Sequence, residues 1–77
     1  MVLGYVLINI APTHEQDVFN KLSKASDIIE IHPLFGEYDL LAKIEAKDYE
    51  KLVEILINNI RPIEGIIDTK TLIGTKF

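Results

Sequence analysis

Residues 28–46, IIEIHPLFGEYDLLAKIEA, decide the fold of this chain. The pattern predicts two β-strands, 28–35 and 38–46, because β-branched and alternating apolar residues flank a turn at Gly36. Pro33 lies inside the first of these strands. Since proline cannot donate a ladder hydrogen bond, we expect this strand at a sheet edge or with a bulge. In the second strand, the residues expected to share the buried face are Leu40, Ala42 and Ile44.

The segment upstream predicts a strand and a helix. Both alternating sets within residues 2–10 are mostly apolar, which indicates a central strand covered on both faces. Thr13, with Gln16 three residues later, has the form of a capping box and predicts a helix to about Lys24. The apolar stripe expected to face the core contains Val18, Leu22 and Ala25, with Phe19 beside them.

The segment downstream predicts a second helix and a last strand. Asp48 is the expected start of the helix, and Arg61 its end, because Pro62 disfavours a helical residue before it. The apolar positions of this helix at i, i+3, i+4 and i+7 spacing are Tyr49, Leu52, Val53, Leu56, Ile57 and Ile60. Residues 66–75 then form the last strand.

The order β-α-β-β-α-β with short links predicts a single α+β domain over residues 1–77, of the ferredoxin-like type. In that arrangement the strands lie in the order 4-1-3-2, which puts Pro33 on an edge strand and residues 2–10 at the centre. Both helices cover one face of the four-stranded antiparallel sheet. The other face exposes apolar residues, Leu41 among them, so we expect a second copy to pack there in a homodimer.

Composition excludes several classes of protein. The 77 residues contain no cysteine, so neither disulfides nor a cysteine-built zinc site stabilises the domain. A hydrophobic content of 48% is high for so small a monomer and favours self-association. The net charge of −4 argues against direct nucleic-acid binding, because an acidic domain repels phosphates. No stretch is long enough to span a membrane, and we expect a cytoplasmic protein.

Two motifs resemble the effector-binding (RAM) domain of the Lrp/AsnC transcriptional regulators. They are the turn 36–39 and the run 53–73, which contains the spacing Thr69-x-Thr71, and the resemblance extends over nearly the whole chain. It implies dimers paired through their sheets, possible tetramers of dimers, and an amino acid or similar effector bound where dimers meet. Full-length members of the family carry an N-terminal helix-turn-helix domain, whereas this sequence begins directly at the first predicted strand. We therefore expect a stand-alone form of the domain that works with full-length regulators.

The resemblance implies an effector held by the turn after the second strand, by Arg61 and by the start of the last strand. The residues with suitable chemistry at these places are Gly36, Glu37, Tyr38, Asp39, Arg61, Thr69 and Thr71. Glu37 and Asp39 would accept from an ammonium and, in a regular strand, would point the same way. Arg61 would pair with a carboxylate. Gly36 opens the backbone N–H groups of its turn to the ligand.

Most of these residues also have a structural interpretation. Gly36 fits a turn that needs positive φ, Tyr38 is expected to pack, and Asp39 is equally suited to bracing the turn. Thr69 and Thr71 are ordinary strand formers, and Arg61 suits the C-terminal dipole of its helix. The predicted residues therefore leave open whether any effector is bound. A domain that only assembles and binds nothing is a further hypothesis.

The alternative function is a small dimeric ferredoxin-like enzyme, such as a cofactor-free isomerase or monooxygenase, with His14 or His32 as its base. Such an enzyme needs a polar pocket between helices and sheet. The predicted inward stripes are aliphatic, which favours a filled core. Two histidines without cysteine are a poor basis for a metal site, so we expect neither catalysis nor a metal or cofactor.

Overall fold

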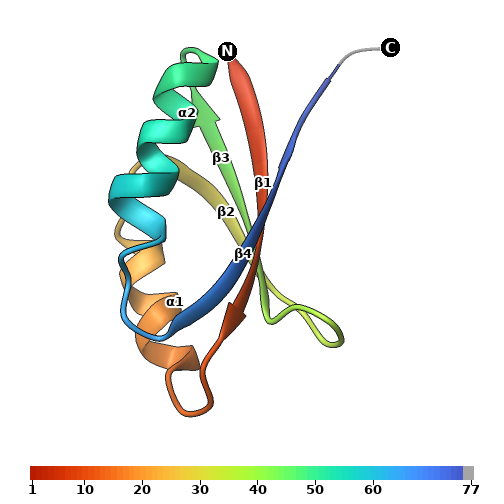
Figure 1. The fold of residues 1–77 in the computed structure, drawn as a ribbon, viewed down its shortest axis with the longest axis vertical. Helices are drawn as coiled ribbons and strands as arrows, with labels where there is room; N and C mark the ends of the chain where they lie inside the picture. Colours follow the sequence, from red (N-terminus) through yellow and green to blue (C-terminus); the bar gives the residue numbers. More distant parts are fainter. Residues whose placement is uncertain (76–77) are drawn as a thin grey trace.

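The structure, a computed structural model, describes residues 1–75 and has the predicted ferredoxin-like α+β architecture. Its elements are β1 (Val2–Ile10), α1 (Glu15–Ser23), β2 (Ile28–Pro33), β3 (Leu40–Ala46), α2 (Tyr49–Ile55), the π-helical turn η1 (Leu56–Ile60) and β4 (Ile66–Ile73). The antiparallel sheet has the order β2-β3-β1-β4, and both helices lie on one of its faces (Figure 1). The predicted order and the edge position of β2 are confirmed.

The hydrophobic core lies between this helical layer and the sheet. Alternate residues of β1 and β3 face it, as do one side of α1 and one side of α2 with η1. Its buried members are Val6, Ile8, Ile10, Val18, Leu22, Leu40, Ala42, Ile44, Ala46, Leu52, Ile55, Leu56 and Ile60. A Cβ on Gly4 would lie 2.9 Å from a methyl carbon of Leu52, so the missing side chain lets α2 approach β1 closely.

Helix α1 begins later than the capping-box pattern predicted. Thr13 has a positive φ of 73°, and the N–H of His14 donates to the carbonyl of Ala11 at 3.1 Å. Pro12 and Thr13 are therefore the central residues of a β-turn, and Thr13 does not cap the helix. The N-cap is His14, without a side-chain cap bond, and the side chain of Gln16 donates to Asn20 instead.

The hairpin of β2 and β3 is shorter than predicted. Strand β2 ends at Pro33 and β3 starts at Leu40, so residues 34–39 form a loop where we expected a two-residue turn. Strand β2 is an edge strand, as its proline indicated, and its register with β3 shifts between Ile28 and Glu30, at the end of the strand away from Pro33. Strand β4 likewise ends at Ile73, two residues before its predicted end.

The second helix starts as predicted, since the Asp48 carboxylate accepts from the N–H of Lys51 at 2.8 Å. Its last turn is a π-turn, which the apolar spacing did not indicate. Two residues of the predicted stripe, Tyr49 and Ile57, are exposed, and Ile55, outside that stripe, is buried. Helix α2 packs against β3 and β1, and neither Tyr49 nor Ile57 is buried there.

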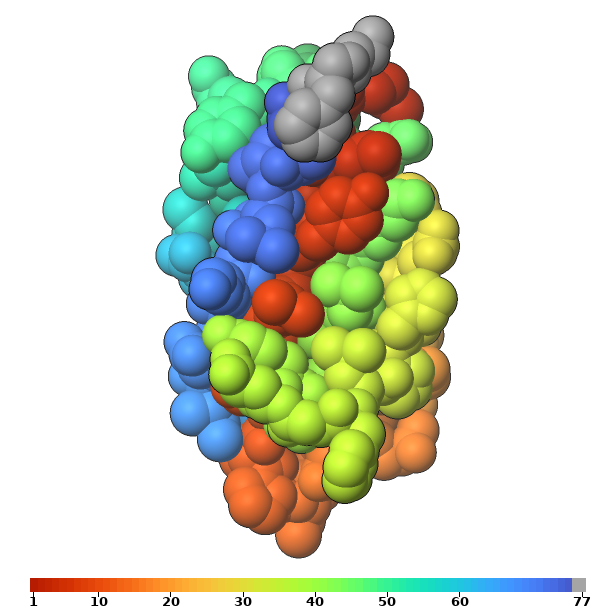
Figure 2. Space-filling view, turned by 90° about the vertical axis from the view of Figure 1, so that its right-hand side faces the viewer, coloured from red at the N-terminus to blue at the C-terminus, as the bar shows by residue number. Residues whose placement is uncertain are grey.

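The face of the sheet opposite the helices carries a half-buried apolar strip over β1 and β3. Its members are Leu3, Tyr5, Leu7 and Leu41. Figure 2 shows this open face, with the β2–β3 loop lying across one end of it. Glu30 borders the strip on the β2 side and contacts His32 at 2.9 Å and Lys43 at 3.4 Å. Within residues 1–75, no helix is both long and apolar enough to cross a membrane.

Candidate functional site

The loop between β2 and β3 is attached to β1 through Asp39. The Asp39 carboxylate accepts from the N–H of Ile10 at 2.8 Å, and the Asp39 N–H donates to the carbonyl of Ile8 at 2.9 Å. The carbonyl of Asp39 in turn accepts from the N–H of Leu34. Three bonds hold this one residue, so Asp39 closes the loop and anchors it to the central strand. The structural interpretation of Asp39 is the one that these contacts support.

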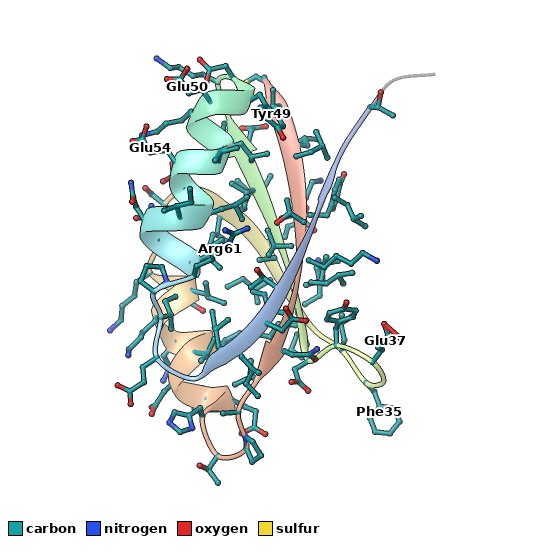
Figure 3. The ribbon with its side chains drawn as sticks, in the orientation of Figure 1. Phe35, Glu37, Tyr49, Glu50, Glu54 and Arg61 are labelled. Atoms are coloured by element: carbon teal, nitrogen blue, oxygen red, sulfur yellow. The ribbon has the colours of Figure 1, made fainter. Side chains whose placement is uncertain are left out.

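The tip of the same loop projects into solvent. Gly36 has a φ of 129°, in the region that favours glycine, and no atom lies within 4 Å of a Cβ built on it. Glu37 is exposed, and Figure 3 shows Glu37 and Phe35 on the loop, beyond the open face of the sheet. Because residues 37–39 lie outside β3, the expected strand alternation does not apply to Glu37 and Asp39. Tyr38 is half-buried.

The second predicted group of residues is brought together beside β4. Thr69 pairs with Ile8 and Thr71 with Val6, both of which are fully buried on the helix side, so both threonines face the helices. Arg61, at the end of η1, lines a hollow of about 380 Å³ with Thr69 and a second hollow of about 200 Å³ with Thr71. All three are among the residues that the family resemblance implies for effector binding.

This group of residues suits an anionic ligand. Arg61 is exposed and forms no ion pair within residues 1–75, so its guanidinium donors are available to a carboxylate. The threonines add hydroxyls that donate or accept. Asp68 lines the larger hollow as well, a residue that sequence reasoning did not select. Asp68 could have been predicted from its position in the sequence, directly before Thr69.

Glu37 and Arg61, from the two predicted parts of the site, lie on opposite sides of the sheet in one copy of the chain. Figure 3 shows Arg61 between η1 and β4, on the helix side, and Glu37 on the projecting loop. The hollow beside Asp39, about 360 Å³, is formed by the loop with the start of α1, including Glu15 and Phe19. The hollows beside Arg61 are formed by η1, α2 and β4. A ligand that contacts both Glu37 and Arg61 therefore needs two copies.

The two histidines have separate local surroundings. His14 packs on Gly65, whose added Cβ would lie 2.7 Å from the His14 Cβ, and its Nδ1 lies 3.2 Å from the Pro12 carbonyl. His32 lies on the exposed side of β2, where its hydrogen bond, together with the charge and hydrogen bond of Lys43, lowers the pKa of Glu30. Neither histidine lines the hollows described above. Residues 1–75 contain no group of three or more His, Asp or Glu side chains arranged for a metal ion.

Comparison with known protein families gives one strong match. Residues 3–76 match the family model described as the Lrp/AsnC ligand binding domain. Among curated proteins, the HTH-type transcriptional regulator FL11 of Pyrococcus furiosus is 33% identical over 75 residues, which are 97% of this chain and 49% of the regulator. The chain thus spans about half the length of such relatives. A homocitrate synthase of Sulfurisphaera tokodaii is 39% identical over 59 residues, 77% of this chain but 13% of the synthase.

Solved structures have the same fold. The structure of FFRP-DM1 is similar with a TM-score of 0.93 and 31% identity, and the match covers 97% of this chain and all of that one. AsnC from E. coli has a TM-score of 0.92 and 25% identity, over 99% of this chain and 52% of AsnC. This chain thus resembles about half of AsnC.

Proposed function

Because the chain belongs to the Lrp/AsnC ligand-binding domain family, we propose that it binds a small amino-acid effector and couples this binding to its own assembly. The assembly would extend from dimers to tetramers of dimers, and to full-length regulators of the same family, through which the domain modulates transcription. The relatives that it matches over nearly its whole length are transcriptional regulators, which favours this role over that of an enzyme.

The observation that carries the proposal is the position of Arg61 beside Thr69 and Thr71. A free amino acid presents a carboxylate and an ammonium group. The carboxylate would pair with the Arg61 guanidinium, which has no ion-pair partner within residues 1–75, and hydrogen bonds to the threonine hydroxyls would orient it. Charge-assisted bonds of this kind are stronger than neutral ones, so one arginine can set the position of a small ligand.

A second copy of the chain would bind the ammonium group of the same effector. Glu37 is exposed on a loop that projects away from the sheet, on the side opposite Arg61. A carboxylate at this position is available to a neighbour but not to its own Arg61. An effector that joins Glu37 of one copy to Arg61 of another would bind only the assembled form, and mass action then makes the effector favour assembly.

The open sheet face supports pairing of copies. Leu7 and Leu41 are direct neighbours across β1 and β3 and lie on the face that the helices do not cover. Covering this strip with a second sheet would remove apolar surface from water, which is the main driving force for association. The dimer would thus form through the sheets, and the effector would act on contacts between dimers.

Calorimetric titration with the twenty amino acids, combined with light scattering at each end point, tests the proposal. We expect at least one amino acid to bind and to increase the mean particle mass. Arg61→Gln should weaken that binding at least tenfold, since a charged hydrogen bond contributes roughly 1.5–3 kcal/mol. Lys24→Gln is the matched control, because Lys24 is an exposed cation at the end of α1 and lines neither hollow beside Arg61. Absence of binding at millimolar concentrations of every amino acid would contradict the sensing role.

A further inference from the structure

One row of residues crosses the open face of the sheet from edge to edge. His32 on β2 pairs with Leu41 on β3, Leu41 pairs with Leu7 on β1, and Leu7 pairs with Lys70 on β4. Residues paired across a ladder point to the same face, so all four lie on the face that the helices leave uncovered (Figure 2). The centre of this row is apolar. A group that carries a positive charge, or can acquire one, lies at each end.

Glu30 is the carboxylate that contacts the β2 end of this row. Its Oε1 lies 2.9 Å from Nε2 of His32, and its Oε2 lies 3.4 Å from Nζ of Lys43. The side chains of His32 and Glu30 are 55% and 48% exposed, so both groups are hydrated in a single copy of the chain. The His32 hydrogen bond, and then Lys43, hold the pKa of Glu30 below its usual value. This carboxylate is therefore still ionised at about pH 5.5.

Two sheets stacked with their central leucines in contact can be related by two kinds of two-fold axis. If the axis runs along the strands, the rotation exchanges the two edges of the sheet, and His32 of one copy faces Lys70 of its partner. If the axis runs along the row, His32 faces the same residue of its partner. The first arrangement also brings Glu30 near the partner's Lys70, which matches opposite charges. In both arrangements an imidazolium at position 32 meets a positive charge across the interface.

The other ionisable groups of this face lie outside the row. They are Glu45 on β3, Asp68 on β4, and Tyr5, whose ring centre lies 5.9 Å from Nζ of Lys43. Asp68 is two residues from Lys70, which is about 7 Å along a strand. It therefore screens the Lys70 charge less than a direct ion-pair partner would.

We propose that His32 makes the pairing of copies through the open sheet face sensitive to acid, so that copies pair when the imidazole is neutral and separate when it is protonated. The inference rests on the sheet-to-sheet dimer of the proposed function and adds its regulation. In a separate copy, the imidazolium lies in water beside the Glu30 carboxylate. In the dimer it loses water and faces a second cation, and like charges removed from water repel strongly. Protons thus bind better to separate copies, and by reciprocity they favour separation.

The first test measures the dimer on the unmodified protein. Sedimentation equilibrium gives its dissociation constant at several pH values, and histidine changes charge between about pH 8 and 5. We expect this constant to rise at least about fivefold from pH 7.5 to 5.5. Circular dichroism verifies that the chain remains folded at both ends of the range. An unchanged constant overturns the inference and leaves the proposed function intact, whereas a single copy at every pH contradicts the inference and the assembly part of the proposed function.

The second test assigns the acid response to one of the two histidines. His32→Gln removes the ionisable group but keeps a side chain that can donate to Glu30, so its dissociation constant should change less than about twofold over the same range. His14→Gln is the matched control, because His14 lies at the start of α1, away from the open face, and this variant should keep the response of the parent. A full acid response in His32→Gln, or its loss in His14→Gln, overturns the inference.

Discussion

The Asp39 carboxylate accepts a hydrogen bond from the backbone N–H of Ile10 at 2.8 Å, which joins the β2–β3 loop to the end of the central strand. The N–H of Ile10 has its acceptor in a side chain 29 residues away. Loss of such an acceptor leaves a partly buried donor unpaired, and this defines the contribution of Asp39 to stability.

Asp39→Ala should therefore lower the free energy of unfolding by roughly 1–3 kcal/mol, because the Ile10 donor loses its charged partner. Chemical denaturation in urea measures the change. Glu37→Ala is the matched control on the same loop, and its exposed side chain predicts a change within about 0.5 kcal/mol. A loss of effector affinity in Asp39→Ala without any loss of stability would contradict the structural role.

Two glycines with positive φ provide a second prediction on stability. Gly65→Ala should be the more destabilising substitution, by roughly 1–3 kcal/mol, because the new methyl would lie 2.7 Å from the His14 Cβ and the backbone is strained as well. Gly36→Ala has the strain alone, since nothing lies within 4 Å of its added Cβ. Thermal unfolding of both variants should rank Gly65→Ala below Gly36→Ala, and the reverse order would be inconsistent with these contacts.

Deletion of Asn58 tests the π-turn. With one residue fewer in Leu56–Ile60, the segment can continue as an α-helix in which the Arg61 N–H still donates to the Leu56 carbonyl, now four residues back. Arg61 then keeps its direction, so we expect effector affinity close to that of the parent and a retained helical signal in circular dichroism. Asn58→Ala, which keeps the length of the turn, is the control. A loss of affinity as large as that of Arg61→Gln in the deletion variant alone would contradict this expectation.

Leu41→Lys tests the sheet-to-sheet dimer. Leu41 pairs with Leu7 at the centre of the open face, so a lysine there would place a charge against the partner's apolar strip. We expect light scattering to report a lower mass, approaching one copy at micromolar concentration. Ile57→Lys, on the helix side, should leave the dimer intact. Retention of the full mass in Leu41→Lys would exclude this face as the interface.

The cluster on β2 and β3 predicts a small dependence of stability on pH. The His32 hydrogen bond and the Lys43 charge lower the pKa of Glu30 in the folded protein. A depressed carboxyl pKa contributes stability above the unfolded pKa, and this contribution disappears as pH falls through the folded pKa. The melting temperature of Glu30→Gln should hence decrease less on acidification than that of the parent. Glu37→Gln is the control, and an identical acid response of all three proteins would contradict the prediction.

The sequence predicted the fold because its local signals agree with one topology. The apolar residues on both faces of 2–10 predict a central strand, and Pro33 predicts an edge strand. Both signals agree with one order of the four strands. The start of α1 was predicted wrongly, because a capping-box pattern and a β-turn use the same residues. Only the φ of 73° at Thr13 distinguishes them. The π-turn was missed for a similar reason, since its residues continue the apolar spacing of an α-helix.

The candidate site was predictable in composition but not in arrangement. Thr69 and Thr71 share one face of β4, as strand alternation predicts, and each lines a hollow with Arg61. The role of Asp39 required the register of β1, which brings the Ile10 N–H within 2.8 Å of the carboxylate. Glu37 and Arg61 lie on opposite sides of the sheet because the β2–β3 loop projects away from the helices. No local sequence pattern predicts the direction of this loop.

Gly4 sets how closely α2 approaches the central strand. It pairs with Ile73 on the neighbouring strand, and the space where its side chain would be is taken up by Leu52 of α2. A methyl group at position 4 would lie 2.9 Å from a methyl carbon of Leu52, so that side chain would have to shift. The contact between this helix and the sheet thus depends in part on a single absent methyl group on the central strand.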